Sequence, residues 1–521
     1  MNEQENEISK SKLITISVVL LIASLLFVLD YSISSVILPY VIGDLGARYE
    51  QGTYIVTTFS IGNAFAIPPL FFLVKRFGER RMMVMILLLF PLVSFLCGIT
   101  DSFNLLLFLR FILGVISGPI LPLSLFILLD TFPKKHHGMV FGIWSSVLIL
   151  APMIGPLIGG FLTTVFSWRV VFISAVPIGI ICGLVLAYEL DLEKKGKWTS
   201  FDFFGYFLLV IISATSQFMM DKGQQWDWHR SKLVLCLAGA CLLSLILLIV
   251  WTKHHTPPVL DFALLKKKNF LLSIIVLIFS YSSFFGTIVL VPLWLETYMG
   301  YDAFTAGLAN APLGIMPVIL APFNHIFMRY LTTRQLLFIS MCIFAASTYW
   351  CMNFYVDIDL YHIQMSRFFN GFGFAIFLAP LLTLSLEDVS EEEKPQALIF
   401  FHYVRTSIGA LGTGLLNTVW TRRTVFHRQF LTEFVNVLNP YVDKYIEASK
   451  KVRFFIGDHL ALINRDAENQ GRVLGLLDVF FVITCFYCCA ALCIFLWWLV
   501  PKIYTMLTAK EKTQNPVIQN S

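Results

Sequence analysis

Charged side chains are scarce in this sequence. Lys, Arg, Asp and Glu together make up 14% of the 521 residues, whereas 57% of the residues are hydrophobic. Soluble domains carry about 25% charged residues, so this composition excludes a soluble protein. Apolar runs of ~18–25 residues recur along the chain, and each is long enough to cross a hydrocarbon core as a helix. The sequence therefore predicts an all-α polytopic membrane protein.

Several kinds of chemical site are missing as well. The sequence has no glycine-rich phosphate loop and no metal-ligand cluster, which argues against an ATP-driven pump. No nucleophile is paired with a base, so membrane enzymology has no support from the residues. The ten cysteines fall in or at the ends of apolar runs, where they make neither a disulfide framework nor a metal site. We therefore expect a protein that is not an enzyme and has no cofactor.

What the sequence does contain is a series of about fourteen apolar runs. The first run, residues 13–41, follows a polar start without a small-residue cleavage site, so we expect an uncleaved first span. Lys and Arg cluster in the short loops between runs, most densely in residues 75–81 after the second run. Basic loops face the cytoplasm, which predicts that this turn and both termini lie inside.

An internal repeat divides the chain. Arg110-Phe-x-x-Gly114 recurs as Arg367-Phe-x-x-Gly371, and in both copies an acid follows twenty residues after the Arg. Pro69, Arg76 and Arg81 likewise recur at one fixed offset, as Pro322, Arg329 and Arg334. A repeat of this kind indicates a chain built from two similar halves.

The repeat predicts two six-span halves separated by two inserted spans. The predicted units are a first half at 1–190, two inserted linker spans at 191–265, a second half at 266–500 that includes an outer loop at 421–474, and a cytoplasmic tail at 501–521.

The segment from Gly142 to Gly160 is apolar and yet rich in residues that disturb helices. Its small residues Ala151, Gly155 and Gly159 are spaced four apart and form one stripe on a helix, where another backbone can approach closely. Generic helix packing explains one such pair of small residues more readily than the whole array. The array comprises Gly142, Ala151, Pro152, Gly155, Pro156, Gly159 and Gly160.

This array fits the pattern Gly-x8-(Gly/Ala)-x3-Gly-Pro-x2-Gly-Gly and resembles the fifth-span antiporter motif of drug:proton exporters in the major facilitator superfamily. Leu29-Asp30-x-Ser32, Trp168-Arg169 and Asp221-Lys222-Gly223 follow in the order found in that family. Together these motifs resemble the 14-span drug:proton antiporters, and most of all the EmrB-type inner-membrane pumps of tripartite multidrug efflux systems.

The resemblance implies a major facilitator fold and proton-coupled export of hydrophobic or amphipathic drugs by alternating access. It also implies a multi-pass protein of the bacterial inner (cytoplasmic) membrane that works with a periplasmic adaptor (membrane fusion) protein and an outer-membrane channel, driven by the proton gradient. Two alternatives stay open. One is a dedicated exporter or symporter of a single metabolite or lipid, and the other is a membrane receptor or scaffold that does not transport.

The basic turn after the second span departs from the family pattern Gly-x-x-x-Asp-Arg-x-Gly, because Phe71 and Lys75 occupy its Gly and Asp positions. The residues expected to form a cytoplasmic gating loop there are Lys75, Arg76, Gly78, Arg80 and Arg81. The acids between 387 and 393 are expected in a solvated cytoplasmic loop, with salt bridges of an inside gate as the alternative.

Asp30 is the one acid well inside the first span. A carboxylate in a membrane is costly enough to need a partner or a functional reason. Arg110 in the fourth span lies at a similar predicted depth, because the first span runs outward and the fourth inward. We expect the two to pair and to carry proton coupling; a static ion pair that only packs helices is the alternative.

Other polar residues in apolar runs are candidates for lining a substrate cavity, although such residues often only bridge helices. For His402 a hydrogen-bonded buried histidine is the simpler interpretation. The candidates are Asn63, Gln217, Asn310, Asn370, His402 and Arg405.

The longest polar stretch, residues 421–472, is expected on the outside between the last two spans. Phe430, Phe434, Val437 and Leu438 follow roughly helical spacing within it. The stretch is therefore predicted to form helix and either to dock the adaptor or to fold back as a self-packed lid.

Overall fold

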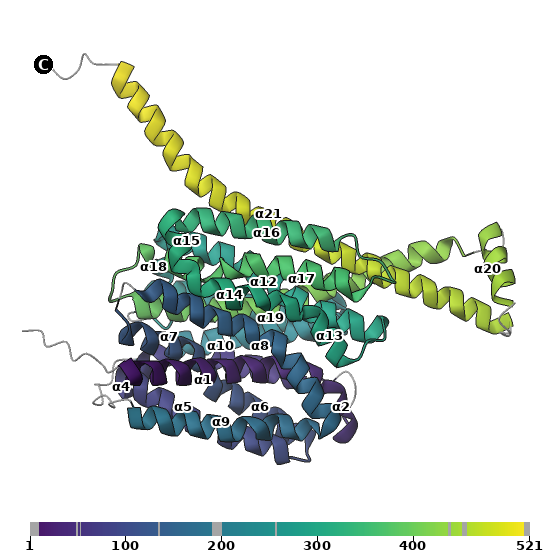
Figure 1. Ribbon diagram of the computed structural model, residues 1–521, viewed down its shortest axis with the longest axis horizontal. Helices are drawn as coiled ribbons and strands as arrows, with labels where there is room; N and C mark the ends of the chain where they lie inside the picture. The colour runs from purple at the N-terminus through teal and green to yellow at the C-terminus, as the bar shows by residue number, and fades with distance from the viewer. Residues whose placement is uncertain are drawn as a thin grey trace, which may run out of the picture.

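The protein is described here by a computed structural model. It describes residues 10–47, 51–52, 54–133, 136–189, 201–255, 258–435, 439–450 and 456–514. These residues form helices and connecting turns, and they contain no strand. The long helices run side by side along one direction, with the first part of the chain on one side of the bundle and the later part on the other (Figure 1). The all-α prediction is confirmed.

The first part of the chain, up to residue 189, forms nine helices in the described ranges. They are α1 (Lys10–Val36), α2 (Leu38–Asp44), α3 (Tyr54–Ala66), α4 (Leu70–Phe77), α5 (Glu79–Ile99), α6 (Phe103–Ser117), α7 (Ile120–Thr131), α8 (His137–Val165) and α9 (Trp168–Glu189). Some of these helices continue one another in one direction, and we call such a series, or a single long helix, a rod. Prolines account for the breaks within rods, because proline removes a helical hydrogen bond. α3 and α4 meet at a 58° bend beside Pro68 and Pro69, and Pro119 separates α6 from α7.

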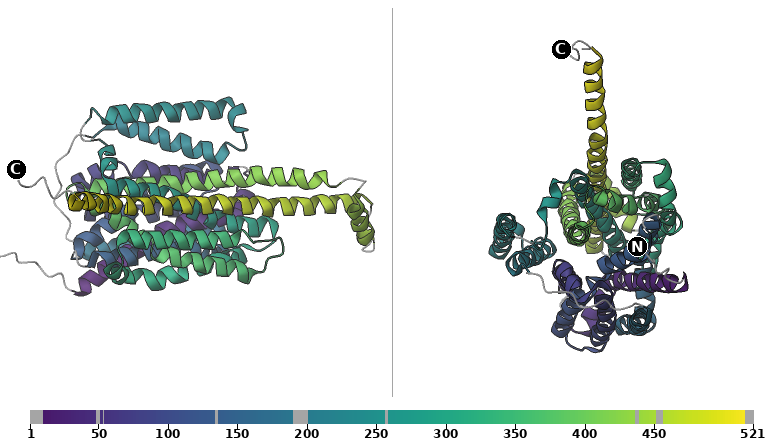
Figure 2. Two further views of the ribbon diagram at one scale, coloured as in Figure 1. Left: turned by 90° about the horizontal axis from the view of Figure 1, so that it is seen from above. Right: turned by 90° about the vertical axis from the view of Figure 1, so that its left-hand side faces the viewer.

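Two inserted helices follow, α10 (Phe203–Lys222) and α11 (Lys232–Thr252), joined through a short 3-10 turn, η3 (Trp228–Arg230). Asp202 caps α10 by accepting a hydrogen bond from the amide of Gly205. α10 packs against α3 and α19, whereas α11 packs mainly on α10. The pair therefore lies at the edge of the bundle, where Figure 2 shows it standing apart from the other helices.

The later part of the chain forms the remaining described helices. They are η4 (Phe262–Lys266), α12 (Lys268–Tyr298), α13 (Ala303–Asn310), η5 (Ala311–Gly314), α14 (Ile315–Leu320), η6 (Ala321–Phe323), α15 (Asn324–Tyr330), α16 (Thr333–Cys351), α17 (Leu360–Ala375), α18 (Leu378–Glu387), α19 (Lys394–Glu433), α20 (Pro440–Lys450) and α21 (Ile456–Gln514). Pro312, Pro317 and Pro322 divide α13 to α15 into short pieces that continue one another as a rod.

The helices account for a multi-pass membrane protein. Among the described residues, eleven helical stretches are long and apolar enough to cross a membrane, and the bent pair α3–α4 brings the number to twelve. α16 and α19 pack along these spans, against α21 and α12. These two helices are less apolar than the other twelve, because α16 begins with polar residues and α19 carries several arginines. With these two included, the described part of the chain has the fourteen rods that the sequence predicts.

The two sides of the bundle meet along α8. One face of α8 packs on α1, and another packs on the rod α13–α15. Ser146 donates a 3.0 Å hydrogen bond from its Oγ to the carbonyl of Pro317, across the interface. A side chain at Gly142 would overlap the carbonyl oxygen of Ala321, so glycine is what allows the two backbones to touch.

The polar stretch 421–472 continues the helices on either side of it. α19 and α21 run out beyond the bundle as a hairpin, with α20 at its tip (Figures 1 and 2). The hairpin is fastened at its base, where Asp478 accepts hydrogen bonds from Arg423 Nε at 2.5 Å and His427 Nε2 at 2.6 Å. Phe430 lies in α19 and Phe434 at its end, whereas Val437 and Leu438 lie outside the described residues.

Candidate functional site

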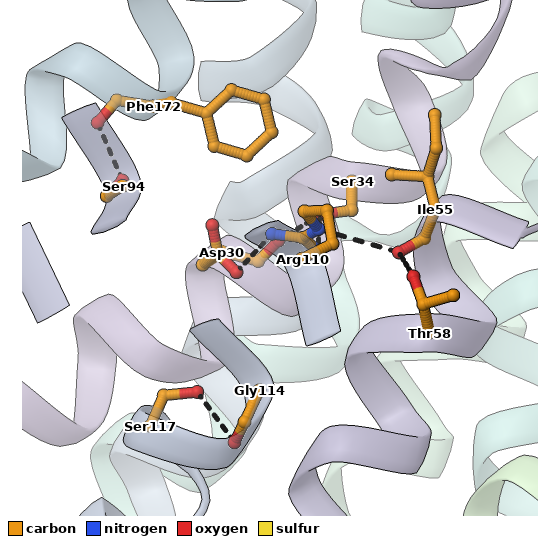
Figure 3. Close-up of polar contacts among 9 residues, drawn as sticks. All are labelled: Asp30, Ser34, Ile55, Thr58, Ser94, Arg110, Gly114, Ser117 and Phe172. Carbon is orange, nitrogen blue, oxygen red and sulfur yellow. Dashed lines mark hydrogen bonds and ion pairs between the residues drawn. The ribbon is translucent and has the colours of Figure 1, made fainter. Parts of the chain in front are cut away.

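A buried ion pair lies in the first part of the chain. Arg110 Nη1 on α6 is 2.8 Å from Asp30 Oδ2 on α1, and the exposed fractions of the two side chains are 0% and 6%. Arg110 Nη2 donates to Ser34 Oγ at 2.5 Å, and Ser34 Oγ in turn donates to the carbonyl of Asp30 (Figure 3). The pairing expected from helix depth is therefore present, and Ser34 belongs to the same network.

Aromatic rings cover the remaining faces of the guanidinium. The guanidinium carbon of Arg110 lies 4.4 Å from the centre of the Phe59 ring and 5.4 Å from that of Phe172, distances at which a cation is attracted to a ring. Phe59 can come this close because α3 and α6 touch at two glycines. An added Cβ would lie 3.0 Å from the Val115 amide nitrogen at Gly62 and 3.1 Å from the Asn63 amide nitrogen at Gly114. In the repeated pattern Arg-x3-Gly, the glycine thus lies one turn from the arginine and lets α3 approach closely enough to bury the guanidinium.

A cavity opens between the two sides of the bundle, beside this ion pair. Its lining comes from α1, α3 and α7 on one side and from α12 and α19 on the other. The lining residues are Phe27, Val28, Tyr31, Ser60, Asn63, Leu121, Tyr281, Phe285, Arg405, Thr406, Gly409 and Ala410. Apolar and aromatic walls with a few polar groups are typical of sites for small organic ligands.

One aromatic layer separates the ion pair from the cavity. α1 presents Asp30 to Arg110 and the next residue, Tyr31, to the cavity. α3 does the same with Phe59 and Ser60. The Phe59 ring lies 6.1 Å from the ring of Tyr31, centre to centre, so it contacts the cavity wall on one side and the guanidinium on the other. A displacement of Tyr31 would therefore be passed through Phe59 to the surroundings of Arg110.

The antiporter array lies on α8 with its two prolines inside the helix. Its small-residue stripe faces α1: an added Cβ would lie 2.7 Å from Ser32 Oγ at Gly155 and 2.6 Å from Ile33 Cγ2 at Gly159. Ser32 Oγ also donates a 3.2 Å hydrogen bond to the carbonyl of Pro152, an oxygen that stays accessible because Pro156 has no amide hydrogen to bond it. Ala151 and Gly160 are buried on the same helix.

The opposite face of α8 makes the contact with the later half. Gly142 meets Ala321, as described above, and the Cβ of Pro156 lies 3.1 Å from the position of a Cβ at Gly307. One array therefore serves two interfaces, which the sequence pattern does not separate.

Of the six polar candidates for the cavity, Asn63 and Arg405 line it. Asn310 and Asn370 instead bridge helices, donating from Nδ2 to the Ile288 carbonyl at 3.3 Å and to Ser347 Oγ at 2.8 Å. Gln217 is buried on α10, where neither amide atom has a partner among the described residues. The bridging alternative thus describes the two asparagines, whereas Gln217 lies in the inserted pair.

His402 is fully buried, with its ring 5.6 Å from that of Trp144 in an edge-on arrangement. Within the described part of the chain neither ring nitrogen has a hydrogen-bond partner, so the expected hydrogen bond is not present there. It does not line the cavity, although Arg405 three residues later does.

Several lining residues are absent from the sequence-based candidates. Tyr31, Ser60, Tyr281 and Thr406 give the cavity hydroxyl groups, and Phe27 and Phe285 add apolar rings. In an apolar helix such residues also serve packing, so composition does not distinguish them. The spacing Arg405, Thr406, Gly409, Ala410 is the one usable signal, because positions one turn apart share a helix face.

The predicted gating loop joins α4 to α5. Arg80 Nη2 bonds to Asp130 Oδ2 at 3.0 Å, and Lys75 lies 4.1 Å from the centre of the Phe71 ring. Gly78 turns the chain with φ of 82°, a conformation that favours glycine. The other two members lie at the ends of these helices: Arg76 stacks over Phe77, and Arg81 is partly buried in the first turn of α5. The lysine and phenylalanine that depart from the family pattern thus contact each other.

The acids between 387 and 393 are not simply solvated. Asn269 at the start of α12 donates from Nδ2 to Glu387 at 3.0 Å and from its backbone amide to Asp388 at 3.2 Å. Lys267 forms an ion pair with Glu393 and is the main cause that lowers the pKa of that carboxyl to about 2. Glu387, Asp388, Glu391 and Glu392 are exposed, as expected of a solvated loop. The contacts add to that loop, and each of them joins elements of the later half.

The repeat is not symmetric in its charges. Arg367 on α17 occupies the place of Arg110 and is fully buried, but its Nη2 donates a hydrogen bond to Cys351 Sγ at 3.2 Å. Within the described residues no carboxylate pairs with Arg367, and its Nε and Nη1 have no partner. The buried carboxylate–guanidinium pair is therefore a property of the first half.

Comparison with known proteins agrees with this architecture. The sequence profile of the Major Facilitator Superfamily matches residues 20–413. The chain is 32% identical over 482 residues to the multidrug export protein EmrB of Escherichia coli K12, which covers 92% of this chain and 94% of that protein. It is also 32% identical over 457 residues to the fatty acid resistance protein FarB of Neisseria gonorrhoeae, covering 87% of this chain and 90% of that protein.

A solved structure supports the fold alone. The crystal structure of a bacterial homologue of the human lysosomal transporter Spinster, in an inward-facing and unoccupied conformation, matches with a TM-score of 0.57 at 15% identity, covering 94% of this chain and 98% of that one. The profile match and the identity to full-length relatives show that this chain belongs to the Major Facilitator Superfamily and, within it, to the EmrB-type multidrug export proteins, which are transporters and not enzymes.

Proposed function

We propose that this protein exports hydrophobic and amphipathic compounds, taken from the cytoplasm or the inner leaflet, in exchange for protons. The observation that carries the proposal is the buried Asp30–Arg110 pair, one aromatic layer from a cavity between the two sides of the bundle. A carboxylate in such a place is charged only while its cation holds it. Protonation of Asp30 breaks its bond to Arg110 and releases the guanidinium. The loss of this bond is the step that links a proton to movement around the cavity.

The transport cycle is alternating access between two halves. The first half is residues 1–190 and the second 266–500, with 191–265 as linker spans and 501–521 as a tail. A proton from outside neutralises Asp30 as the compound leaves, and its loss toward the cytoplasm restores the pair. α8 lies where the halves meet, so its glycines and prolines allow the two backbones to slide while they stay in contact.

The proposed setting is the bacterial inner (cytoplasmic) membrane, with both termini in the cytoplasm. The basic turn at 75–81 then faces the cytoplasm and forms part of the inner gate. The hairpin of α19, α20 and α21 projects from the opposite end of the bundle, where it would meet a periplasmic adaptor protein that leads to an outer-membrane channel. Its length beyond the bundle supports docking over a self-packed lid.

A dedicated exporter of one lipid is the second candidate, favoured by the name of the relative FarB, a fatty acid resistance protein. A protein without transport activity is the third. It is disfavoured because the ion pair, the antiporter array and the cavity occur together.

Reconstitution in proteoliposomes tests the proposal. With an inward-directed or outward-directed pH gradient and a fluorescent hydrophobic drug, we expect drug movement to follow the proton gradient, and drug addition to move protons. Movement of one lipid and no drug would support the second candidate. If the protein is correctly folded and neither drug nor lipid causes protons to move, the proposal is overturned. A matched deletion strain tested against a panel of compounds then identifies the substrates.

A further inference from the structure

Arg405 is the one charged side chain among the described residues that line the cavity. It lies on α19, in the middle of the bundle, and is 7% exposed. Its Nη1 donates to the Tyr281 hydroxyl at 3.2 Å, and the guanidinium carbon lies 5.5 Å from the centre of that ring. The cation is thus held by a neutral phenol.

The described residues supply no negative charge to Arg405. No carboxylate pairs with it, and its Nε has no hydrogen-bond partner among them. Asp30, a buried acid on α1 on the other side of the cavity, is already paired with Arg110 at 2.8 Å. A buried guanidinium without a counter-ion is unfavourable, because the charge has lost its hydration and gained no anion in return.

The rest of the lining sets what an anion here would have to look like. Phe27, Phe285 and Leu121 provide an apolar wall, and Gly409 and Ala410 leave room on α19 beside the arginine. Tyr31, Ser60 and Asn63 face from the first half with groups that hydrogen-bond but carry no charge. A planar guanidinium is the side chain best suited to a carboxylate, which it binds through two parallel hydrogen bonds.

We propose that this cavity selects apolar organic anions, and that Arg405 is the residue that recognises their carboxylate. The inference rests on the proposed export function and names the substrate class within it. The carboxylate of the ligand neutralises the charge of Arg405, as Asp30 neutralises that of Arg110 in the first half. Tyr281 positions the guanidinium and yields one hydrogen-bond donor to the ligand.

Binding of three matched probes to the full-length protein in lipid nanodiscs tests this. The probes are 1-pyrenebutyrate, 1-pyrenebutanol and a pyrenebutyl trimethylammonium, which share the apolar part and differ in charge. Dissociation constants come from fluorescence anisotropy. Because hydrogen bonds to a charged group are the stronger kind, we expect the wild-type protein to bind the carboxylate about tenfold or more tightly than the alcohol, and the ammonium most weakly.

The variants place that preference on one residue. Arg405→Gln should abolish the preference for the carboxylate while leaving the alcohol bound. Arg405→Lys should keep part of that preference, because lysine is a cation but cannot form the bidentate pair. Arg422→Gln removes the same charge from an exposed position on the same helix, and should behave as wild type. Each variant is checked by size-exclusion chromatography, and the wild-type series decides the question even if Arg405→Gln does not fold.

The outcomes distinguish failure of the charge selectivity from failure of the proposed export function. Equal wild-type affinities for the carboxylate and the ammonium, or an unchanged preference in Arg405→Gln, overturn the charge selectivity and leave proton-coupled export standing. Loss of transport of the neutral alcohol in Arg405→Gln shows that Arg405 serves the transport cycle and overturns its assignment as the recognition residue. No binding of any probe and no substrate-driven proton movement overturns the proposed function together with the inference.

Discussion

Phe59 separates Arg110 from the cavity. Its ring centre lies 4.4 Å from the guanidinium carbon of Arg110 on one side and 6.1 Å from the ring of Tyr31, a lining residue, on the other. Close packing transmits displacements, so the state of the ion pair and the contents of the cavity share one contact. This relationship is the physical basis for expecting that a proton and a substrate compete through the same region.

Asp30→Asn should insert and fold but lose active export. Asparagine keeps the size of the side chain and cannot change its charge, so it removes the step at which a proton acts. We expect a drop of about tenfold or more in gradient-driven drug movement, with drug binding retained. The measurement is drug flux against its gradient in proteoliposomes. Asp357→Asn, a change at an exposed carboxylate, is the matched control.

The same variant has a second consequence for stability. Removing one partner of a buried pair leaves the other charge uncompensated, at a penalty of ~3–5 kcal/mol in soluble proteins. Asp30→Asn should therefore lower the melting temperature, and the double variant Asp30→Asn, Arg110→Gln should recover part of the loss. Wild-type export by Asp30→Asn would assign coupling to another acid.

Gly155→Leu should abolish transport while the protein still inserts. Even a Cβ at this position would lie 2.7 Å from Ser32 Oγ, so a leucine would force α8 away from α1. Gly239→Leu on α11 is the control, because nothing lies within 4 Å of an added Cβ there. Transport is measured in cells together with the amount of protein in the membrane. Normal export by Gly155→Leu would show that the α1–α8 contact can open without harm.

A disulfide between Gly138→Cys and His325→Cys should block the cycle reversibly. An added Cβ at Gly138 lies 3.3 Å from that of His325, close to the separation found in disulfides, and the two positions belong to different halves. Alternating access requires the halves to part at this end in one state. Oxidation should stop transport and reduction restore it, with oxidised wild-type protein as the control for its own ten cysteines. Full activity of the crosslinked protein would mean that the halves do not separate here.

Replacing residues 430–470 with a short Gly/Ser linker should separate export in cells from transport in vitro. The described residues of this segment lie in the hairpin beyond the bundle, away from the cavity and from the Asp30–Arg110 pair (Figure 2). Drug binding and proton coupling in proteoliposomes should persist, whereas resistance in cells and crosslinking to the adaptor should disappear. If both survive the replacement, the hairpin is not the docking surface.

Glu393→Gln should leave the pH profile of transport unchanged between about pH 5 and 8. The pKa of Glu393 is lowered to about 2, first by its hydrogen bond with Lys267. A carboxyl whose folded pKa is depressed contributes stability above its unfolded pKa and loses it as the pH falls toward the folded value. Across the working range the Glu393 carboxyl is therefore always charged. The check is the rate of transport against pH beside wild type; a shifted profile would make Glu393 a titrating member of the cycle.

Much of this protein follows from local properties of the chain. The polarity and length of each run predict the helices, because a backbone in a membrane must satisfy its own hydrogen bonds. The shared depth of Asp30 and Arg110 follows from the rise per residue in two helices of opposite direction. The repeat around Arg110 and Arg367 likewise appears in the sequence, although the sequence does not show that the second arginine lacks a carboxylate.

What the tertiary structure alone decided is which face of each helix meets which neighbour. His402 and Arg405 are three residues apart and so lie only ~60° apart around α19, yet Arg405 lines the cavity and His402 packs against Trp144. The α8 array contains small residues for α1 and others for α13–α15, and the pattern is the same for both. Rotation about the helix axis depends on how all the helices pack at once. No local stretch of sequence specifies it.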